Sequence, residues 1–130
     1  MDNPAIMWPV TPDSPPVPVV ILEHTEPGGG PHWDLLVARE PGPTARLWGL
    51  RCHECPIGYA ESVIPVDPMP DHRNAWLDLE GDVRGGRGSV RRLARGVLVV
   101  RGDVAEVRWE DGRASRWRLF GSGLTVVMES

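Results

Sequence analysis

Lysine is absent from this chain. All 14 basic residues among the 130 are arginine, which excludes mechanisms that need a lysine amine: the phosphate-binding P-loop, the Schiff base and the covalent nucleotide transfer of a ligase. A GC-rich codon bias is the simpler explanation of the composition itself. Any anion that the protein binds must therefore be bound by arginine, whose planar guanidinium matches the oxygens of a phosphate.

Cysteine and long apolar runs are also scarce. Cys52 and Cys55 are too few for a secreted disulfide framework or for four zinc ligands, so we interpret them as buried or solvated thiols. The longest apolar run, 17–22, is far shorter than the roughly 20 residues of a membrane helix. The N-terminus lacks the basic and apolar regions of a signal peptide. We therefore expect a monomeric cytoplasmic protein without a membrane partner.

Charge is distributed unevenly along the chain. Residues 1–83 hold four arginines and thirteen acids, a net charge of −9, whereas residues 84–118 hold ten arginines and four acids, a net charge of +6. An acidic half joined to an arginine-rich segment can bring a cation site and a phosphate-contacting surface together. Strand faces on which each arginine pairs with a nearby acid explain the pattern equally well.

Glycine and proline are abundant, at 15 and 14 residues, while an apolar content of 41% with six tryptophans is sufficient for one core. Residues 1–16 contain five prolines and are predicted to form an extended N-terminal arm, with one domain over 17–130. No window keeps a period of 3.6 over three turns. Short apolar segments separated by glycine and proline turns predict a mainly β, single-domain fold, an antiparallel barrel or sandwich with at most one or two short helices.

Alternation and turn residues give the expected strands. Residues 52–71 contain four prolines and are predicted to be irregular. A break is predicted at Arg95-Gly96, and Asp111-Gly112 is a hairpin signal. The expected strands are 17–24, 32–39, 45–51, 74–80, 89–93, 97–101, 104–110, 113–120 and 124–128.

Three side chains with metal-binding atoms fall where the first two expected strands meet. His24 ends one strand, His32 begins the next after a seven-residue loop, and Asp34 lies two residues further on. Residues two apart in a strand share a face, and a hairpin would place His24 beside them. Two imidazoles and a carboxylate suit a divalent transition metal with open positions for water or substrate. Two solvent-facing histidines and an ordinary strand aspartate are the alternative.

A glycine-rich segment, residues 85–92, carries three candidate phosphate-binding side chains, Arg87, Arg91 and Arg92. Glycine permits close approach of the backbone to a phosphate, and arginine binds phosphate oxygens in pairs. A tight hairpin without a ligand is the alternative. No helical pattern follows the segment, so it is not the glycine motif of a dinucleotide fold.

Taken in order, these segments resemble the 3′-phosphoesterase domain of bacterial DNA ligase D and the small stand-alone proteins that share this domain. The resemblance covers about residues 17–120. Its order and spacing are more specific than any single motif. The matching segments are VVILEH (19–24), HWDLLV (32–37), DHRNAWLDLEG (71–81), GGRGSVRRLARG (85–96) and, more loosely, LWGLR (47–51).

The resemblance implies a small β-barrel that removes 3′-terminal phosphates or ribonucleotides from DNA ends during break repair, with repair proteins as further partners. It implies Mn²⁺ as the cofactor, with Zn²⁺ as the alternative. Carried over by position, His24, His32 and Asp34 would be metal ligands. His72 would contact the scissile phosphate or assist proton transfer.

The chain departs from the family pattern at four positions. Leu36 stands where the family has a phosphate-contacting arginine, and Ala38 where it has a nearby acid. Leu22 replaces a glutamine of the family, and Trp76 replaces a tyrosine. The lost arginine could be replaced from elsewhere, by Arg39, Arg46, Arg51 or Arg87. Two alternatives to the enzyme therefore stay open: a relative that binds nucleic acid without turnover, and a barrel that binds a small ligand or a protein.

Overall fold

Nine strands and one single-turn 3₁₀ helix account for the regular structure of this computed structural model, which describes residues 5–58 and 62–129. These described residues contain no helix with the length and apolar character needed to span a bilayer. The elements are β1 (Val17–Thr25), β2 (Pro31–Ala38), β3 (Leu47–Cys52), β4 (Val63–His72), η1 (Asn74–Leu77), β5 (Gly81–Asp82), β6 (Ser89–Arg101), β7 (Val104–Trp109), β8 (Ala114–Phe120) and β9 (Gly123–Glu129).

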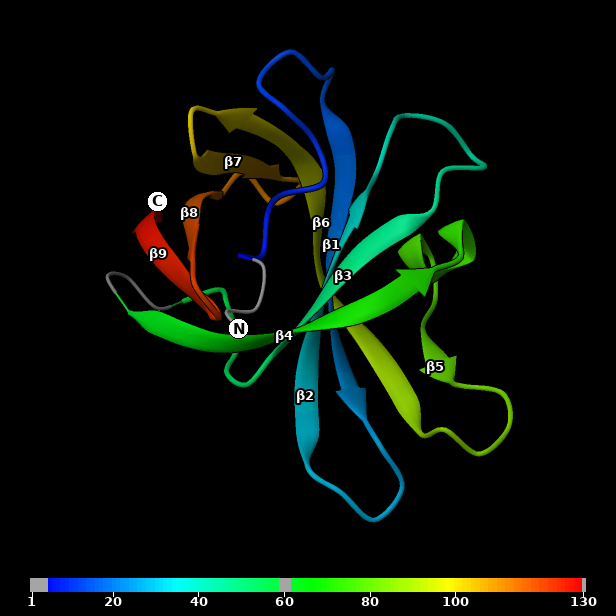
Figure 1. Ribbon diagram of the computed structural model, residues 1–130. Helices are drawn as coiled ribbons and strands as arrows, with labels where there is room; N and C mark the ends of the chain where they lie inside the picture. The colour runs from blue at the N-terminus through cyan, green and yellow to red at the C-terminus, as the bar shows by residue number, and fades with distance from the viewer. Residues whose placement is uncertain (1–4, 59–61, 130) are drawn as a thin grey trace.

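Eight of these strands close into a barrel (Figure 1). Neighbours pair antiparallel in the order β1-β2-β3-β4-β9-β8-β7-β6, and β6 pairs back with β1 to close the ring. The short β5 pairs with the start of β6 and lies outside the barrel. The predicted mainly β fold, a single small antiparallel barrel with almost no helix, is therefore confirmed.

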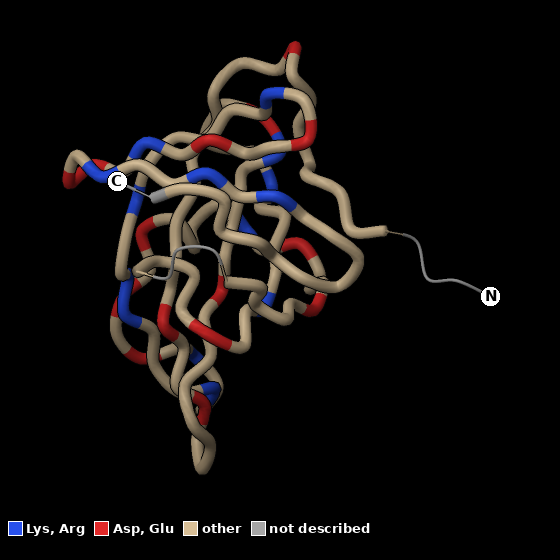
Figure 2. The backbone as a smooth tube through the Cα atoms, turned by 90° about the vertical axis from the view of Figure 1, so that its left-hand side faces the viewer, with Lys and Arg blue, Asp and Glu red and all other residues tan. Residues whose placement is uncertain are grey.

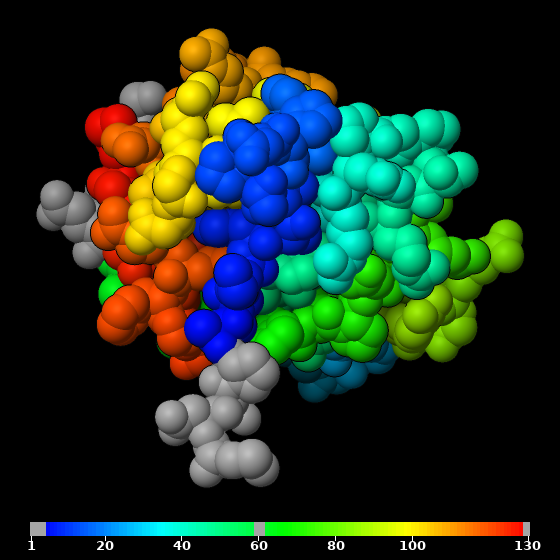
Figure 3. Space-filling model, turned by 45° about the horizontal axis from the view of Figure 1, so that its top comes forward, coloured from blue at the N-terminus to red at the C-terminus, as the bar shows by residue number. Residues whose placement is uncertain are grey.

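Tryptophans fill the centre of the core, and one of them comes from the segment before β1. The Trp8 ring centroid lies 5.7 Å from that of Trp48 on β3 and 6.4 Å from that of Trp117 on β8, which is fully buried. Val10 is buried as well. In Figure 3 this segment (blue) lies between the yellow-to-orange strands and the cyan-to-green residues. Of the expected arm over 1–16, residues 5–16 thus contact the barrel, and residues 1–4 lie outside the described residues.

Most expected strands are present within a few residues of their predicted bounds, but the prediction for residues 52–71 was wrong. This range contains most of β4, which includes Pro65, Pro68 and Pro70. β4 pairs with β9 only through residues 63–65, so Pro68 and Pro70 lie where the strand has a partner on one side, β3. Proline is tolerated at such positions because its missing N–H is not needed by a second neighbour.

The strand predicted over 74–80 was also wrong, since this range begins with η1. The Asn74 side-chain amide donates a hydrogen bond to the carbonyl oxygen of Ala45 (2.8 Å), which holds the start of the turn against the β2–β3 connection. The turn buries Leu77 and directs Trp76 toward the core. Over so few residues, alternation of apolar and polar side chains does not distinguish a strand from one helical turn.

The break predicted at Arg95-Gly96 does not exist, because β6 runs without interruption through both residues. Gly96 is needed for the packing of two strands and does not form a turn. A Cβ atom there would run into the backbone carbonyl of Arg108 on the adjacent β7. The two strands therefore approach so closely that only glycine fits.

We expect Gly96→Ala to destabilise the barrel by about 1–3 kcal/mol, because the added methyl group meets backbone that cannot rotate away. Gly30→Ala is the matched control, since a Cβ atom at this loop position meets no atom within 4 Å. Urea unfolding of both variants measures the difference. Equal stability of the two variants would contradict the packing explanation.

Candidate metal centre

The β1–β2 hairpin places three metal-binding side chains on one face of the sheet. His24 and His32 are directly opposed partners, and Asp34 is opposite Leu22. Because side chains two apart in a strand share a face, His24, His32 and Asp34 all point the same way. By the same alternation Trp48 on β3 points to the other face, where it meets the core.

The ligand atoms of these residues converge. Nδ1 of His24 lies 3.5 Å from one carboxylate oxygen of Asp34, and Nε2 of His32 lies 3.1 Å from the other. One ligand atom from each residue lies within 4.8 Å of the other two. Atoms that bind a divalent metal at about 2.0–2.2 Å are roughly 3–3.5 Å apart, so side-chain movements of about 1 Å would close the cluster on an ion.

One hydrogen bond fixes which nitrogen of His24 faces the cluster. Its Nε2 lies 2.8 Å from the backbone carbonyl oxygen of Arg87. A carbonyl can only accept, so Nε2 carries a proton and donates it, and Nδ1 is the ring nitrogen that faces Asp34. Metal-ligating histidines are typically oriented by such a bond from the nitrogen that does not bind the metal.

Asp34 is the most buried member of the cluster, with a side chain only 1% exposed. Neither of its oxygens, nor Nε2 of His32, has a hydrogen-bond partner among the described residues. Burial raises the pKa of Asp34 to about 6 and lowers that of His32 to about 4. At neutral pH the site therefore holds a buried carboxylate beside neutral imidazole, a combination that a divalent cation would satisfy.

A pocket of about 510 Å³ opens onto this cluster. β1 to β4, η1 and the glycine-rich loop before β6 all contribute to its wall. The predicted residues Arg51, His72 and Arg87 line it together with His24 and Asp34. The structure therefore brings residues from six separate segments of the chain around one cavity.

Arg51 is the cross-strand partner of Asp34 on β3, so its side chain shares the face of the cluster. It donates a hydrogen bond to Glu26 (3.3 Å), while its buried Nε has no hydrogen-bond partner among the described residues. Glu26 also lies 3.8 Å from Nδ1 of His32. Sequence reasoning missed Glu26, although it follows His24 at the same spacing as Asp34 follows His32.

His72 and Trp76 form another part of the pocket wall. Nδ1 of His72 donates to the carbonyl oxygen of Pro70 (3.1 Å), so its Nε2 keeps a free lone pair. The Trp76 ring meets His72 edge to face, with centroids 4.8 Å apart. Burial lowers the pKa of His72 and favours its neutral form.

The other predicted phosphate-binding residues do not line this pocket. Arg91 lies on the opposite face of β6 from Arg92 by strand alternation and pairs with Glu23 at 3.2 Å. Arg92 donates to the backbone carbonyl oxygen of Leu77 at 3.3 Å, so it supports η1. Arg87 contributes both a lining side chain and the carbonyl that orients His24.

Asp71, next to His72, is turned away from the cluster. It forms a two-pronged ion pair with Arg39, at 2.7 and 2.9 Å, which joins the end of β2 to the end of β4. The Asp-His motif thus combines an anchor for β4 with a side chain in the pocket.

The Cys-His-Glu-Cys segment does not contribute to the metal cluster. Cys52 is buried, and it is opposite Trp33 in the ladder, on the other face of the sheet from Asp34. Burial raises the pKa of its thiol. His53 forms a hydrogen bond with Asp67 (2.6 Å) at the surface.

A scan against protein-family models finds no match to this chain, and a search of curated proteins finds none either.

We expect the protein to bind one Mn²⁺ ion, and His32→Ala to weaken this binding by about 100-fold or more, because a ligand atom is lost. Titration calorimetry measures the affinity, and the Mn²⁺-dependent rise in melting temperature gives an independent readout. His53→Ala removes a histidine outside the cluster and should leave both unchanged. Equal affinity of His32→Ala and the wild type would contradict the site.

We expect Asp71→Asn to lower stability by about 0.5–1 kcal/mol at neutral pH, because the Arg39 ion pair is partly exposed. Hydrogen bonds from Arg39 lower the pKa of Asp71. The stabilisation is therefore complete above the ordinary pKa of aspartate and disappears as the pH falls through the lowered value. Urea unfolding at several pH values tests this, with the exposed Asp13→Asn as control. A difference that persists in acid would count against it.

Proposed function

We propose that this protein is a divalent-metal-dependent phosphoesterase that removes 3′-phosphates or 3′-ribonucleotides from DNA ends, with Mn²⁺ held by His24, His32 and Asp34. The observation that carries the proposal is the convergence of two imidazoles on a buried carboxylate that has no hydrogen-bond donor among the described residues. The choice of DNA 3′ ends as substrate rests on the resemblance of the ordered segments to the phosphoesterase domain of DNA ligase D.

A divalent ion bound here would polarise a phosphoryl oxygen and lower the pKa of a bound water. The side chains around the cluster have complementary roles. Arg51 and Arg87 place positive charge on the same pocket, where guanidinium groups can hold the oxygens of a phosphate and offset the charge that develops in the transition state.

His72 provides the proton-transfer group in this proposal. Its Nδ1 is committed to the Pro70 carbonyl, so Nε2 is the ring atom that can take a proton from, or return one to, the phosphate group. Trp76 has no hydroxyl to contribute. Its ring packs edge-on against His72 and limits the orientations that the imidazole can adopt.

Arg51 takes the role of the arginine that the family pattern has at the position of Leu36. Leu36 is fully buried and its side chain packs against Gly49, where an added Cβ would lie 2.9 Å from a Leu36 methyl. Arg51 instead lies directly across the ladder from Asp34, with an Nε–H that no acceptor among the described residues uses. Arg51 lines the same pocket as His24 and Asp34, so a phosphate bound at the cluster would lie beside its guanidinium group.

A binding protein without turnover is the second candidate. It is favoured by Leu22 and Leu36, two fully buried aliphatic residues at positions where the family has polar groups. Such a protein would bind DNA in a salt-dependent manner but release no phosphate. Release of phosphate therefore distinguishes the two candidate functions.

The test is release of inorganic phosphate from a primer–template that ends in a 3′-phosphate, in the presence of Mn²⁺. We expect release by the wild type, loss of about 100-fold or more in His32→Ala, and loss of about 100-fold in Arg51→Gln with unchanged Mn²⁺ affinity. His53→Ala and Arg46→Gln are the matched controls, because both side chains lie outside the pocket.

Two outcomes decide against the enzyme. Wild-type protein that releases no phosphate with Mn²⁺, Mg²⁺ or Zn²⁺ would overturn it, and retained DNA binding in that case would support the second candidate. Undiminished release by His32→Ala would show that the activity does not come from this site.

A further inference from the structure

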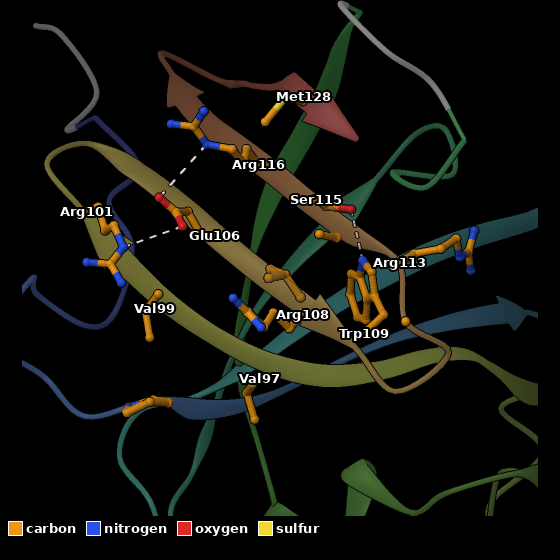
Figure 4. Close-up of a pocket in the computed structure, with 14 residues that line it drawn as sticks. Val97, Val99, Arg101, Glu106, Arg108, Trp109, Arg113, Ser115, Arg116 and Met128 are labelled. Carbon is orange, nitrogen blue, oxygen red and sulfur yellow. Dashed lines mark hydrogen bonds and ion pairs between the residues drawn. The ribbon is translucent and has the colours of Figure 1, made fainter. Parts of the chain in front are cut away.

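A second concave surface lies on the outward face of β6 to β9 (Figure 4). It encloses about 600 Å³, within the range of pockets that bind ligands, and no residue of the metal cluster lines it. Neighbouring strands are about 4.8 Å apart, so a surface across four of them is about 14 Å wide. We call it the arginine groove and define it by Val97, Arg101, Glu106, Arg108, Arg116 and Met128.

The apolar part of the arginine groove is aliphatic. Val97 is 46% exposed and Met128 is 51% exposed, which is unusual for large apolar side chains of this barrel. Trp109, below them, is only 4% exposed and its indole N–H donates to Ser115 at 2.9 Å. The groove therefore offers aliphatic contacts to a partner but no exposed aromatic ring.

The charged part of the arginine groove has more arginine than acid. Glu106 is the one carboxylate among the described lining residues, and Arg101 (3.5 Å) and Arg116 (4.0 Å) approach it from two sides (Figure 4). The Nε atom of Arg116 is buried without a hydrogen-bond partner in the described structure. Arg108 is exposed and forms no ion pair with any described residue. The groove thus carries positive charge that its own carboxylate does not balance.

This imbalance separates the arginine groove from most of the arginine-rich segment. Elsewhere on the barrel acids lie close to the arginines, so that red and blue segments are interleaved along the backbone in Figure 2. Examples are Arg91 with Glu23 and Arg118 with Asp103, each at 3.2 Å. A guanidinium without a carboxylate partner beside exposed aliphatic side chains would bind a ligand that has both acidic and apolar groups.

We propose that the arginine groove binds an extended segment of a partner protein that presents both acidic and aliphatic side chains on one face, at every second residue. Aliphatic side chains of this peptide contact Val97 and Met128, while its carboxylates pair with Arg108 and Arg116. Single-stranded nucleic acid fits less well, because sequence-independent strand binding depends on exposed aromatic rings that stack with bases, and Trp109 is buried. The proposal does not depend on the phosphoesterase activity.

The probe is the labelled peptide Asp-Ser-Leu-Ser-Glu-Ser-Val-Ser, whose odd positions place acidic and aliphatic side chains on one face. It is titrated with the full chain at low salt and followed by fluorescence anisotropy. We expect saturable binding by the wild type. Arg108→Glu should bind about tenfold more weakly, because it removes a cation. Glu106→Gln should bind several-fold more tightly, because it removes the carboxylate that competes with the peptide. Arg73→Glu is the control, since it reverses an exposed arginine outside the groove.

Methyl NMR of labelled methionine gives a readout of position. The signal of Met128, in the arginine groove, should shift on addition of peptide, and that of Met69, in the metal pocket, should not. The proposal is overturned if the wild type shows no saturable binding, if Arg108→Glu binds as well as the wild type, or if only Met69 shifts. If the wild type binds an oligothymidylate more tightly than the peptide, and Arg108→Glu abolishes that binding, the groove is assigned to nucleic acid. Self-association lost in Arg108→Glu would assign it to a second copy.

Discussion

The register of the β1–β2 ladder is the constraint on which both the barrel and the proposed metal cluster depend. His24 faces His32 across this ladder, and Asp34 follows on the same face. A slip of one residue would turn one strand's side chains to the other face and remove its ligands from the cluster. Because β1 also pairs with β6 to close the barrel, the same strand positions the ligands and completes the ring. The buried aliphatic residues on both faces of β1 hold it in this register.

Local signals were sufficient for a mainly antiparallel β fold and for the shared face of His32 and Asp34, because strand alternation and glycine turns act within a few residues. These local signals failed where the structure depends on pairing between strands that are distant in the sequence. Pro68 and Pro70 of β4 are compatible with a strand because β4 has no β9 partner there, and Gly96 marks a close strand contact that no local pattern reveals. Arg51 could be named from the sequence only as one of several candidate arginines. Its position opposite Asp34 follows from the β2–β3 register, which the sequence alone does not show.

The arginines of this lysine-free chain are used in two different ways. Most are ion-paired along the strands, as expected for solvated faces on which each arginine has a nearby acid. Around the proposed metal cluster and in the arginine groove, guanidinium groups keep donors that no described acceptor uses, at Nε of Arg51 and of Arg116. Guanidinium stays protonated at any physiological pH, so both surfaces keep their positive charge even when partly buried. An amine at these positions could lose its proton on burial.

The bond between His24 and the Arg87 carbonyl makes the glycine-rich loop a structural part of the proposed metal centre. Gly88, next in the chain, adopts a left-handed conformation, and a side chain there would strike the backbone of Thr25 at the end of β1. Loop and ligand strand are therefore packed backbone to backbone. A protein engineer who replaced this loop with one of different length would also release the first histidine. The smallest unit that could be grafted onto another barrel is the hairpin together with the glycine-rich loop, two separate segments that meet at the Arg87 carbonyl and at Gly88.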